Sequence, residues 1–173
     1  YTLSIVVWSL NSAATLEDCL QGLDFCDELI VVDGGSHDGS RAIALDFSQR
    51  VYFHPHSNPA MLKHLGCQAA TSDWVLLLEP NERVDVLLKN EIETALSQTT
   101  SNGNALSGFS LPVQPSWGAH AFETPRSAAR RAVRLFQKSQ VQALPLNPLT
   151  NLQVNGQLGH LEGGAVGVVH RPQ

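Results

Sequence analysis

Three short polar turns in the first half of the chain carry the residue types that could bind a charged ligand. They cover residues 9–11, 33–40 and 79–83, and each follows a run of apolar residues. In the second turn, Asp33 can accept a hydrogen bond from an N–H or hydroxyl group of a ligand, and its glycines let a ligand approach the backbone closely. The same Asp-Gly-Gly-Ser sequence also fits a simple turn in which Asp33 caps its own backbone.

The third turn concentrates oxygen donors. Glu79, Asn81 and Glu82 lie within four residues, and carboxylate and amide oxygens suit a hard cation such as Mg²⁺ or Mn²⁺. A cation held there would neutralise a diphosphate. The alternative is that this turn begins a helix, with Asn81 as its N-cap and the acidic side chains near the positive end of the helix dipole. The two interpretations are compatible.

The elements that position these turns alternate between strand and helix. Strands are expected at 3–8, 29–32, 51–53 and 74–78, and helices at 12–23, 41–47, 61–72 and 84–96. This order predicts an α/β fold with a mostly parallel sheet and helices on both faces. Ligands bind outside the carboxyl ends of the strands in such sheets, so the three turns are expected to converge on one crevice.

The second half of the chain departs from this alternation. A polar linker is expected at 100–104, followed by short strands at 108–112, 132–136, 152–154 and 166–169. We interpret this half as a mixed or antiparallel extension of the same sheet, with the loop 112–125 as a lid. The chain is expected to be one domain, 1–173, with a nucleotide-binding half (1–99) and an acceptor-side half (105–173). Whether C-terminal segments are missing is left open.

Composition excludes several classes of protein. The 173 residues carry a net charge of −5, which argues against nucleic acid as a partner. The arginines at 126, 130, 131 and 134 are expected on a solvated surface with one anionic contact. Three cysteines without regular spacing indicate a reducing compartment, and Cys19 and Cys67 fall on apolar helix positions. With no long apolar run, we expect a cytoplasmic location, with peripheral contact at the inner membrane face left open.

Longer stretches resemble glycosyltransferase family 2, within the GT-A fold, and the bacterial lipopolysaccharide-core type in particular. The matching sequences are LSIVVWSLNSAATLEDCLQGL, DELIVVDGGSHDGS and VYFHPHSNPAMLKHLGCQAATSDWVLLLEPNERV, with RRAVRLFQKSQ and GHLEGGAVGVVH as later strands. The first hundred residues agree with the family in order and spacing. The resemblance implies a donor site in which Asp33 contacts the base and Lys63 lies near the diphosphate. The full set of donor-site residues is Ser9, Asn11, Asp33, Gly35 and Lys63.

The resemblance also implies a metal site, and here the chain departs from its family. Glu79 and Asn81 occupy the two positions of an Asp-x-Asp motif, and His170 matches a late histidine close to the metal. Asp-Ala-Asp has become Glu-Pro-Asn, so one formal charge is lost. His64 stands where the family usually has asparagine.

The activity implied is inverting transfer of a sugar from a UDP- or GDP-linked donor to a hydroxyl acceptor, either a saccharide or a lipid-linked saccharide of the cell envelope. A carboxylate would act as general base, with Glu162 and Glu123 as candidates, and Mg²⁺ or Mn²⁺ would act as Lewis acid. The rival hypothesis is a degenerate relative that binds nucleotide, glycan or a protein without transfer. A dinucleotide-binding domain is disfavoured, because no G-x-G-x-x-G follows a strand.

Overall fold

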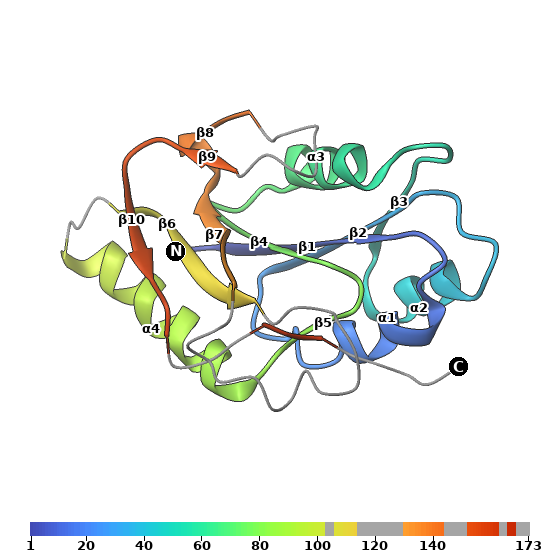
Figure 1. Ribbon diagram of the computed structural model, residues 1–173, viewed down its shortest axis with the longest axis horizontal. Helices are drawn as coiled ribbons and strands as arrows, with labels where there is room; N and C mark the ends of the chain where they lie inside the picture. The colour runs from blue at the N-terminus through green and yellow to red at the C-terminus, as the bar shows by residue number, and fades with distance from the viewer. Residues whose placement is uncertain (103–105, 114–129, 144–151, 163–165, 169–173) are drawn as a thin grey trace.

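The first hundred residues form alternating strands and helices around a central sheet. The computed structural model describes residues 1–102, 106–113, 130–143, 152–162 and 166–168 (Figure 1). Its first elements are β1 (Leu3–Ser9), α1 (Ala13–Leu20), β2 (Glu28–Asp33), α2 (Ser40–Phe47), β3 (Arg50–Phe53), α3 (Pro59–Ala69), β4 (Trp74–Leu78), β5 (Glu82–Val84) and α4 (Val86–Asn102). The strand and helix order predicted from apolar periodicity is therefore confirmed.

The second half contributes short strands to the same sheet. These are β6 (Leu106–Val113), β7 (Arg130–Gln137), β10 (Gln157–His160) and β11 (Val166–Val168), while β8 (Val141–Ala143) and β9 (Gln153–Val154) form a separate ribbon after the short 3₁₀ helix η2 (Lys138–Gln140). The main sheet has the order β3-β2-β1-β4-β7-β6-β11-β5, with β10 beside β6.

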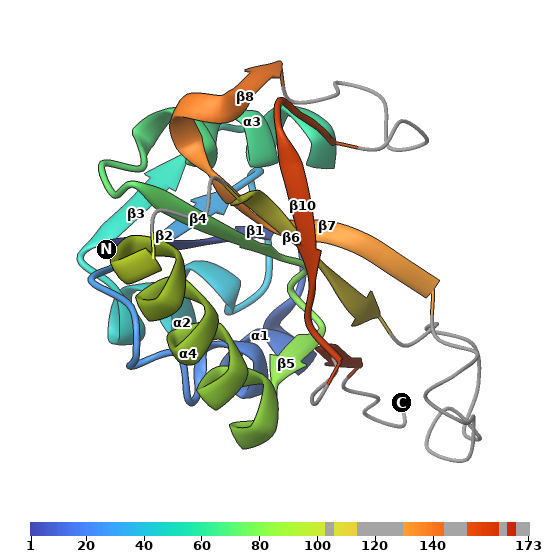
Figure 2. The ribbon, with the colours of Figure 1, turned by 90° about the vertical axis from the view of Figure 1, so that its left-hand side faces the viewer.

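Strand directions divide this sheet into two parts. The strands β3, β2, β1 and β4 are all parallel, and β7 then lies antiparallel to both β4 and β6. Between the halves, β5 pairs with β11, so the two halves of the chain share one sheet. Figure 2 shows the second-half strands β6, β7 and β10 crossing beside β4. The predicted α/β class, mostly parallel with a mixed or antiparallel C-terminal extension, is confirmed: β7 pairs antiparallel, and β10 and β11 pair parallel with β6.

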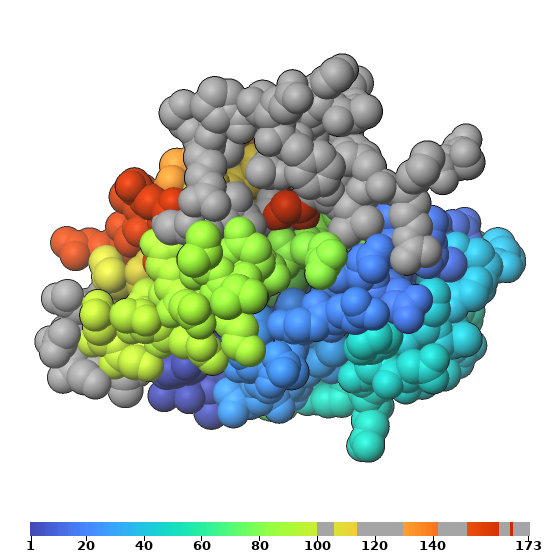
Figure 3. Space-filling model, turned by 90° about the horizontal axis from the view of Figure 1, so that it is seen from below, coloured from blue at the N-terminus to red at the C-terminus, as the bar shows by residue number. Residues whose placement is uncertain are grey.

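Helices cover both faces of the sheet. On one face, Leu16 of α1, Ala44 of α2 and Leu88 of α4 are fully buried in a single apolar cluster. On the other face, Leu62 of α3 packs with Val6 and the neighbouring apolar strand residues. Figure 3 shows α4, α1 and α2 side by side across the first of these faces. The strands of the parallel part are buried on both sides, which explains their continuous apolar sequences.

Close packing of α3 fixes its height above the sheet. A Cβ atom on Gly66 would lie 2.4 Å from Val6 Cγ1 and 3.1 Å from Val32 Cγ2. Glycine at this position therefore lets the helix backbone approach the strands. The start of α3 is set by Asn58, whose Oδ1 accepts a hydrogen bond from the Met61 N–H at 2.9 Å. This helix carries Lys63 toward the carboxyl edge of the sheet.

Two expectations about local structure were wrong. The helix α4 runs to Asn102, through the first part of the linker predicted at 100–104. In its last turns the hydroxyls of Thr94, Ser97 and Thr99 donate to carbonyls four residues earlier, so these polar side chains are satisfied within the helix and do not end it. Three short strands, β5, β8 and β10, were also missed.

Other sequence expectations fit the described structure or lie outside it. Cys19 and Cys67 are buried, as predicted. Nearly all of the predicted lid, 112–125, lies outside the described residues. No helix in the described part of the chain has both the length and the apolar character needed to cross a membrane.

Candidate functional site

The three polar turns lie together at the carboxyl edge of the parallel strands. Asn11 joins the first turn to the second: its N–H donates to Ser36 Oγ at 2.9 Å, and its Oδ1 accepts from the His37 N–H at 2.8 Å. Trp8 joins β1 to the third turn, because its Nε1–H donates to Glu79 Oε2 at 2.8 Å. The predicted convergence of the turns is confirmed.

Backbone conformation holds the first two turns in close contact. Asn11 has φ +48°, in the left-handed region that asparagine tolerates better than most residues. Gly35 has φ +98°, and a Cβ there would lie 3.2 Å from Pro55 Cα. Ser9 is fully buried, and its Oγ has no hydrogen-bond partner among the described residues. These positions are close enough to act together, and their role in donor binding stays a prediction.

The Asp33 carboxylate is turned into its own loop. Its Oδ1 accepts from the N–H groups of Gly35 at 3.0 Å and Ser36 at 2.9 Å, and its Oδ2 accepts from Ser36 Oγ at 2.6 Å. The residue has no exposed surface. The structure thus shows the backbone-capping arrangement that the sequence left open. A contact with a nucleotide base would require this loop to open.

Glu79 lies at the centre of an ion-pair network. Its Oε1 contacts Lys63 Nζ of α3 and, at 3.3 Å, Arg134 Nη1 of β7. Arg134 Nη2 also contacts Glu82 Oε1 at 3.0 Å, so one guanidinium bridges two carboxylates. Lys63 Nζ lies 5.9 Å from the centre of the Trp8 ring. Two carboxylates and two cations from α3, β7 and the turn after β4 therefore form one cluster.

The two carboxylates respond differently to their surroundings. Burial raises the pKa of Glu79, but the charges of Lys63 and Arg134, with hydrogen bonds from Lys63 and Trp8, outweigh it and lower the pKa overall. Burial raises the pKa of Glu82 and prevails over Arg134, because this side chain is only 3% exposed. Glu82 Oε2 also accepts the Glu79 N–H at 2.8 Å, which holds the turn in shape.

Sequence reasoning missed Arg134 as a member of this site and placed it on a solvated surface. That expectation was wrong for Arg134, whose side chain is only 15% exposed. Arg130 is exposed, as expected. The signal was present in the strand pattern. Arg134 lies within the apolar part of a predicted strand, two residues before Phe136, which is buried in the core. An arginine in the apolar part of a strand requires an anionic partner.

The third turn does not begin a helix. Glu82 opens the strand β5, and α4 begins at Val86. Asp85 caps that helix, with its Oδ1 accepting from the Leu88 N–H at 2.7 Å. The alternative in which Asn81 acts as N-cap is therefore wrong, since the pairing of β5 with β11 draws these residues into the sheet.

Comparison with known proteins supports the family resemblance. Residues 4–80, less than half of the chain, match the family model described as Glycosyl transferase family 2. Over these residues the chain is similar to glycosyltransferase family 2. The matched segment contains the first two turns, the helix α3 and Glu79 of the third turn.

A curated relative is the lipopolysaccharide core biosynthesis glycosyltransferase LpsC of Rhizobium meliloti (strain 1021). It is 23% identical over 143 residues, which make up 80% of this chain and 52% of LpsC. The chain thus spans about half the length of this relative.

Two solved structures share the fold. TarS 1–349 of S. aureus in complex with UDP-GlcNAc gives a TM-score of 0.71 at 13% identity, covering 100% of this chain and 60% of that one. Glucosyl-3-phosphoglycerate synthase from Mycobacterium tuberculosis, in complex with Mn²⁺ and UDP-glucose, gives a TM-score of 0.63 at 15% identity, covering 99% and 72%. These likenesses confirm the GT-A type of fold predicted from the sequence.

The described side chains at this edge of the sheet do not fit a divalent cation in their present arrangement. Both oxygens of Glu79 are occupied, by Lys63 and Arg134 on one side and by Trp8 on the other. Glu82 faces Arg134 and a backbone N–H. No group of three or more metal-ligating side chains lies together within the described residues. His170, the third expected ligand, is outside them.

The candidate general bases are not brought into this cluster. Glu162 follows β10 and is exposed, and its N–H donates to Glu91 Oε1 of α4 at 2.7 Å. That contact places its backbone beside α4, whereas Glu79 and its partners contact α3. Glu123 lies outside the described residues. The identity of the base stays a prediction for both residues.

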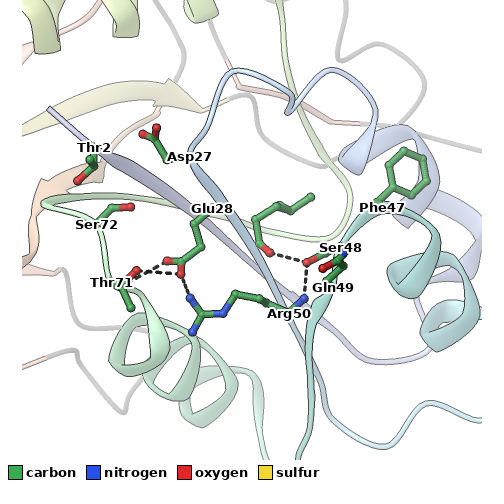
Figure 4. A pocket seen from close by; sticks show the side chains of 10 residues that line it. Thr2, Asp27, Glu28, Phe47, Ser48, Gln49, Arg50, Thr71 and Ser72 are labelled. Atoms are coloured by element: carbon green, nitrogen blue, oxygen red, sulfur yellow. Dashed lines mark hydrogen bonds and ion pairs between the residues drawn. The ribbon is translucent and has the colours of Figure 1, made fainter.

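Two cavities open elsewhere on the chain. One, of about 440 Å³, lies at the amino ends of the parallel strands, opposite the three turns. Figure 4 shows Glu28 there, directed at Thr71 and Arg50, with which it bonds. These contacts fasten β2 to β3 and to the segment before β4. The other cavity, of about 460 Å³, lies between α4 and the strands β6 and β10.

Proposed function

We propose that the protein transfers a sugar, with inversion, from a nucleotide diphosphate donor to a hydroxyl acceptor. The observation that carries this proposal is the meeting of three polar turns at the carboxyl ends of β1, β2 and β4, in a chain whose residues 4–80 match glycosyltransferase family 2. Ligands of open α/β sheets bind at that edge. Solved structures of the same fold hold UDP-GlcNAc or UDP-glucose, which supports a nucleotide sugar as the donor.

The side chains at this edge have distinct proposed roles. Lys63 contacts the donor diphosphate, and Ser9, Asn11 and Gly35 shape the pocket for the nucleoside. Asp33 contacts the base after its loop opens. The acceptor hydroxyl loses its proton to a carboxylate as it attacks the sugar, with Glu162 and Glu123 as candidates.

The acceptor is proposed to be a saccharide or lipid-linked saccharide of the cell envelope. The likeness to LpsC supports this class of acceptor. The divalent ion expected from the sequence rests on relatives, such as the Mn²⁺ complex of glucosyl-3-phosphoglycerate synthase. Because the described residues do not fit such an ion, no step of the proposal uses it.

A second candidate is binding without transfer. It is favoured by the closed state of the site, in which Asp33 is engaged with its own loop and Glu79 with two cations. A chain that had lost catalysis could keep this network as a structural tie between α3, β4 and β7. Partners would then be a nucleotide, a glycan or a protein.

Calorimetry and a release assay together test the proposal. UDP and GDP are titrated into the full 173-residue chain, and UDP-glucose and UDP-GlcNAc are then incubated with it and a panel of saccharide acceptors. The expected result is saturable binding of one nucleotide and acceptor-dependent release of the diphosphate. Binding without release would favour the second candidate, and no binding of any nucleotide would refute both nucleotide-based functions.

A further inference from the structure

The third turn holds two side-chain cations where the family that it resembles places a metal ion. We propose that Lys63 and Arg134 replace the divalent cation, and that they bind the donor diphosphate through their own N–H groups without a metal. This inference rests on the proposed nucleotide-sugar donor and assigns how its charge is held. It starts from the disagreement between the family's metal site and the side chains present here.

Charge supports the replacement. Two carboxylates and one divalent cation sum to zero, and so do Glu79 and Glu82 with Lys63 and Arg134. The present network is therefore neutral without a divalent cation. A metal added to the present network would instead bring two uncompensated positive charges beside two cations, which is unfavourable in a partly buried site.

Competition for the ligand oxygens points the same way. A metal at Glu79 Oε1 would compete with both Lys63 and Arg134, and a metal at Oε2 would lie beside the Trp8 indole N–H that donates to the same oxygen. Asn81, at the second ligand position, offers a neutral amide oxygen, so it adds no negative charge that would attract a metal ion. The change from Asp-Ala-Asp to Glu-Pro-Asn therefore weakens metal binding at both positions of the motif.

The two cations have donors to offer a phosphate. A lysine ammonium carries three N–H groups and an arginine guanidinium five, more than the contacts to Glu79 and Glu82 require. The Lys63 side chain is 23% exposed, so it is not sealed inside the protein. The Trp8 ring and Glu79 hold it in place, which reduces the conformational entropy lost when a ligand binds.

Lys89 provides a matched control for Lys63. Its Nζ also pairs with a carboxylate, Asp24 Oδ1 at 3.1 Å, and also lies over an aromatic ring, with its Nζ 5.4 Å from the centre of Phe25. Its side chain is 30% exposed. It projects from α4, on the opposite face of the sheet from α3. A substitution there removes the same kind of contacts away from the three turns.

The test is calorimetric titration of UDP and GDP into the full chain, in EDTA and again in Mn²⁺. We expect the dissociation constant of the bound nucleotide to change less than about 2-fold between the two conditions. Lys63→Met should weaken binding about 10-fold or more, as expected for a lost charged hydrogen bond, while Lys63→Arg loses less and Lys89→Met leaves binding unchanged. Circular dichroism checks that each variant is folded.

Restoring the motif gives a second, independent test. The double variant Glu79→Asp, Asn81→Asp shortens the first ligand and returns the missing charge, so it should gain Mn²⁺-dependent nucleotide binding that the unmodified chain lacks. Loss of wild-type binding in EDTA, or unchanged affinity of Lys63→Met, would overturn the inference and leave the nucleotide-sugar function standing. Failure of every nucleotide to bind in either condition would overturn that function as well.

Discussion

Removing Arg134 is the sharpest test of the ion-pair network as a structural unit. Arg134→Met keeps most of the aliphatic stem and deletes the guanidinium that pairs with Glu79 at 3.3 Å and with Glu82 at 3.0 Å. Glu82, 3% exposed, would keep only the Glu79 N–H as a partner. Breaking a buried ion pair from one side typically costs about 3–5 kcal/mol, and we expect that loss in the free energy of unfolding near neutral pH.

The penalty should depend on pH in a defined direction. Burial already raises the pKa of Glu82, and loss of Arg134 removes the positive charge that opposes this effect. A carboxyl whose folded-state pKa is raised keeps its proton in the folded protein after the unfolded chain has lost it. Stability therefore falls as the pH rises from the unfolded pKa toward the higher folded pKa and levels off above it, so the penalty should be smaller near about pH 5 than near about pH 7.5.

Urea unfolding followed by tryptophan fluorescence at both pH values measures the effect. Arg130→Met, an exposed arginine at the start of the same strand, is the control and should stay within about 0.5 kcal/mol of the unmodified chain. Adding Glu82→Gln to Arg134→Met removes the unpaired carboxylate, so it should recover part of the loss and flatten the pH dependence. A penalty equal to that of Arg130→Met, or one that does not vary with pH, would refute the reasoning.

Three further predictions follow from the packing of the chain. Asp33→Ala should lower the free energy of unfolding by about 2–4 kcal/mol, since it removes a buried carboxylate with three hydrogen bonds, and Asp33→Asn should lower it less. If thermal melting shows that both variants are as stable as the unmodified chain, the capping role is contradicted. Gly66→Ala should cost about 1–3 kcal/mol in urea unfolding, because its Cβ would meet Val6 Cγ1 at 2.4 Å, and a neutral effect would mean that α3 can lift freely. Burial raises the pKa of the Cys67 thiol to about 12 and that of the less buried Cys26 thiol to about 11. A thiol reagent near about pH 8 should therefore modify Cys26 slowly in the folded chain and Cys67 only on unfolding. Rapid reaction of Cys67 in the folded chain would show an opening of α3.

Local sequence patterns determined the layout of the first hundred residues. Strands such as β1 and β4 are buried on both faces, so they are continuous apolar runs that can be recognised without neighbours. The helices α1 and α4 carry apolar residues at helical spacing. Because parallel strands place their carboxyl ends at one edge, the convergence of the turns at 9–11, 33–40 and 79–83 followed from strand order alone.

The charge arrangement at that edge was decided by tertiary structure. The strand β7 enters the sheet antiparallel beside β4, and this brings Arg134 to Glu79, 55 residues earlier in the chain. Pairing of β5 with β11 turns Glu82 inward, where a helix start had been an alternative. Ion pairs between residues so far apart produce no periodicity or spacing in the sequence. The sequence alone therefore located the turns, and only the packing of distant strands decided which cations neutralise their carboxylates.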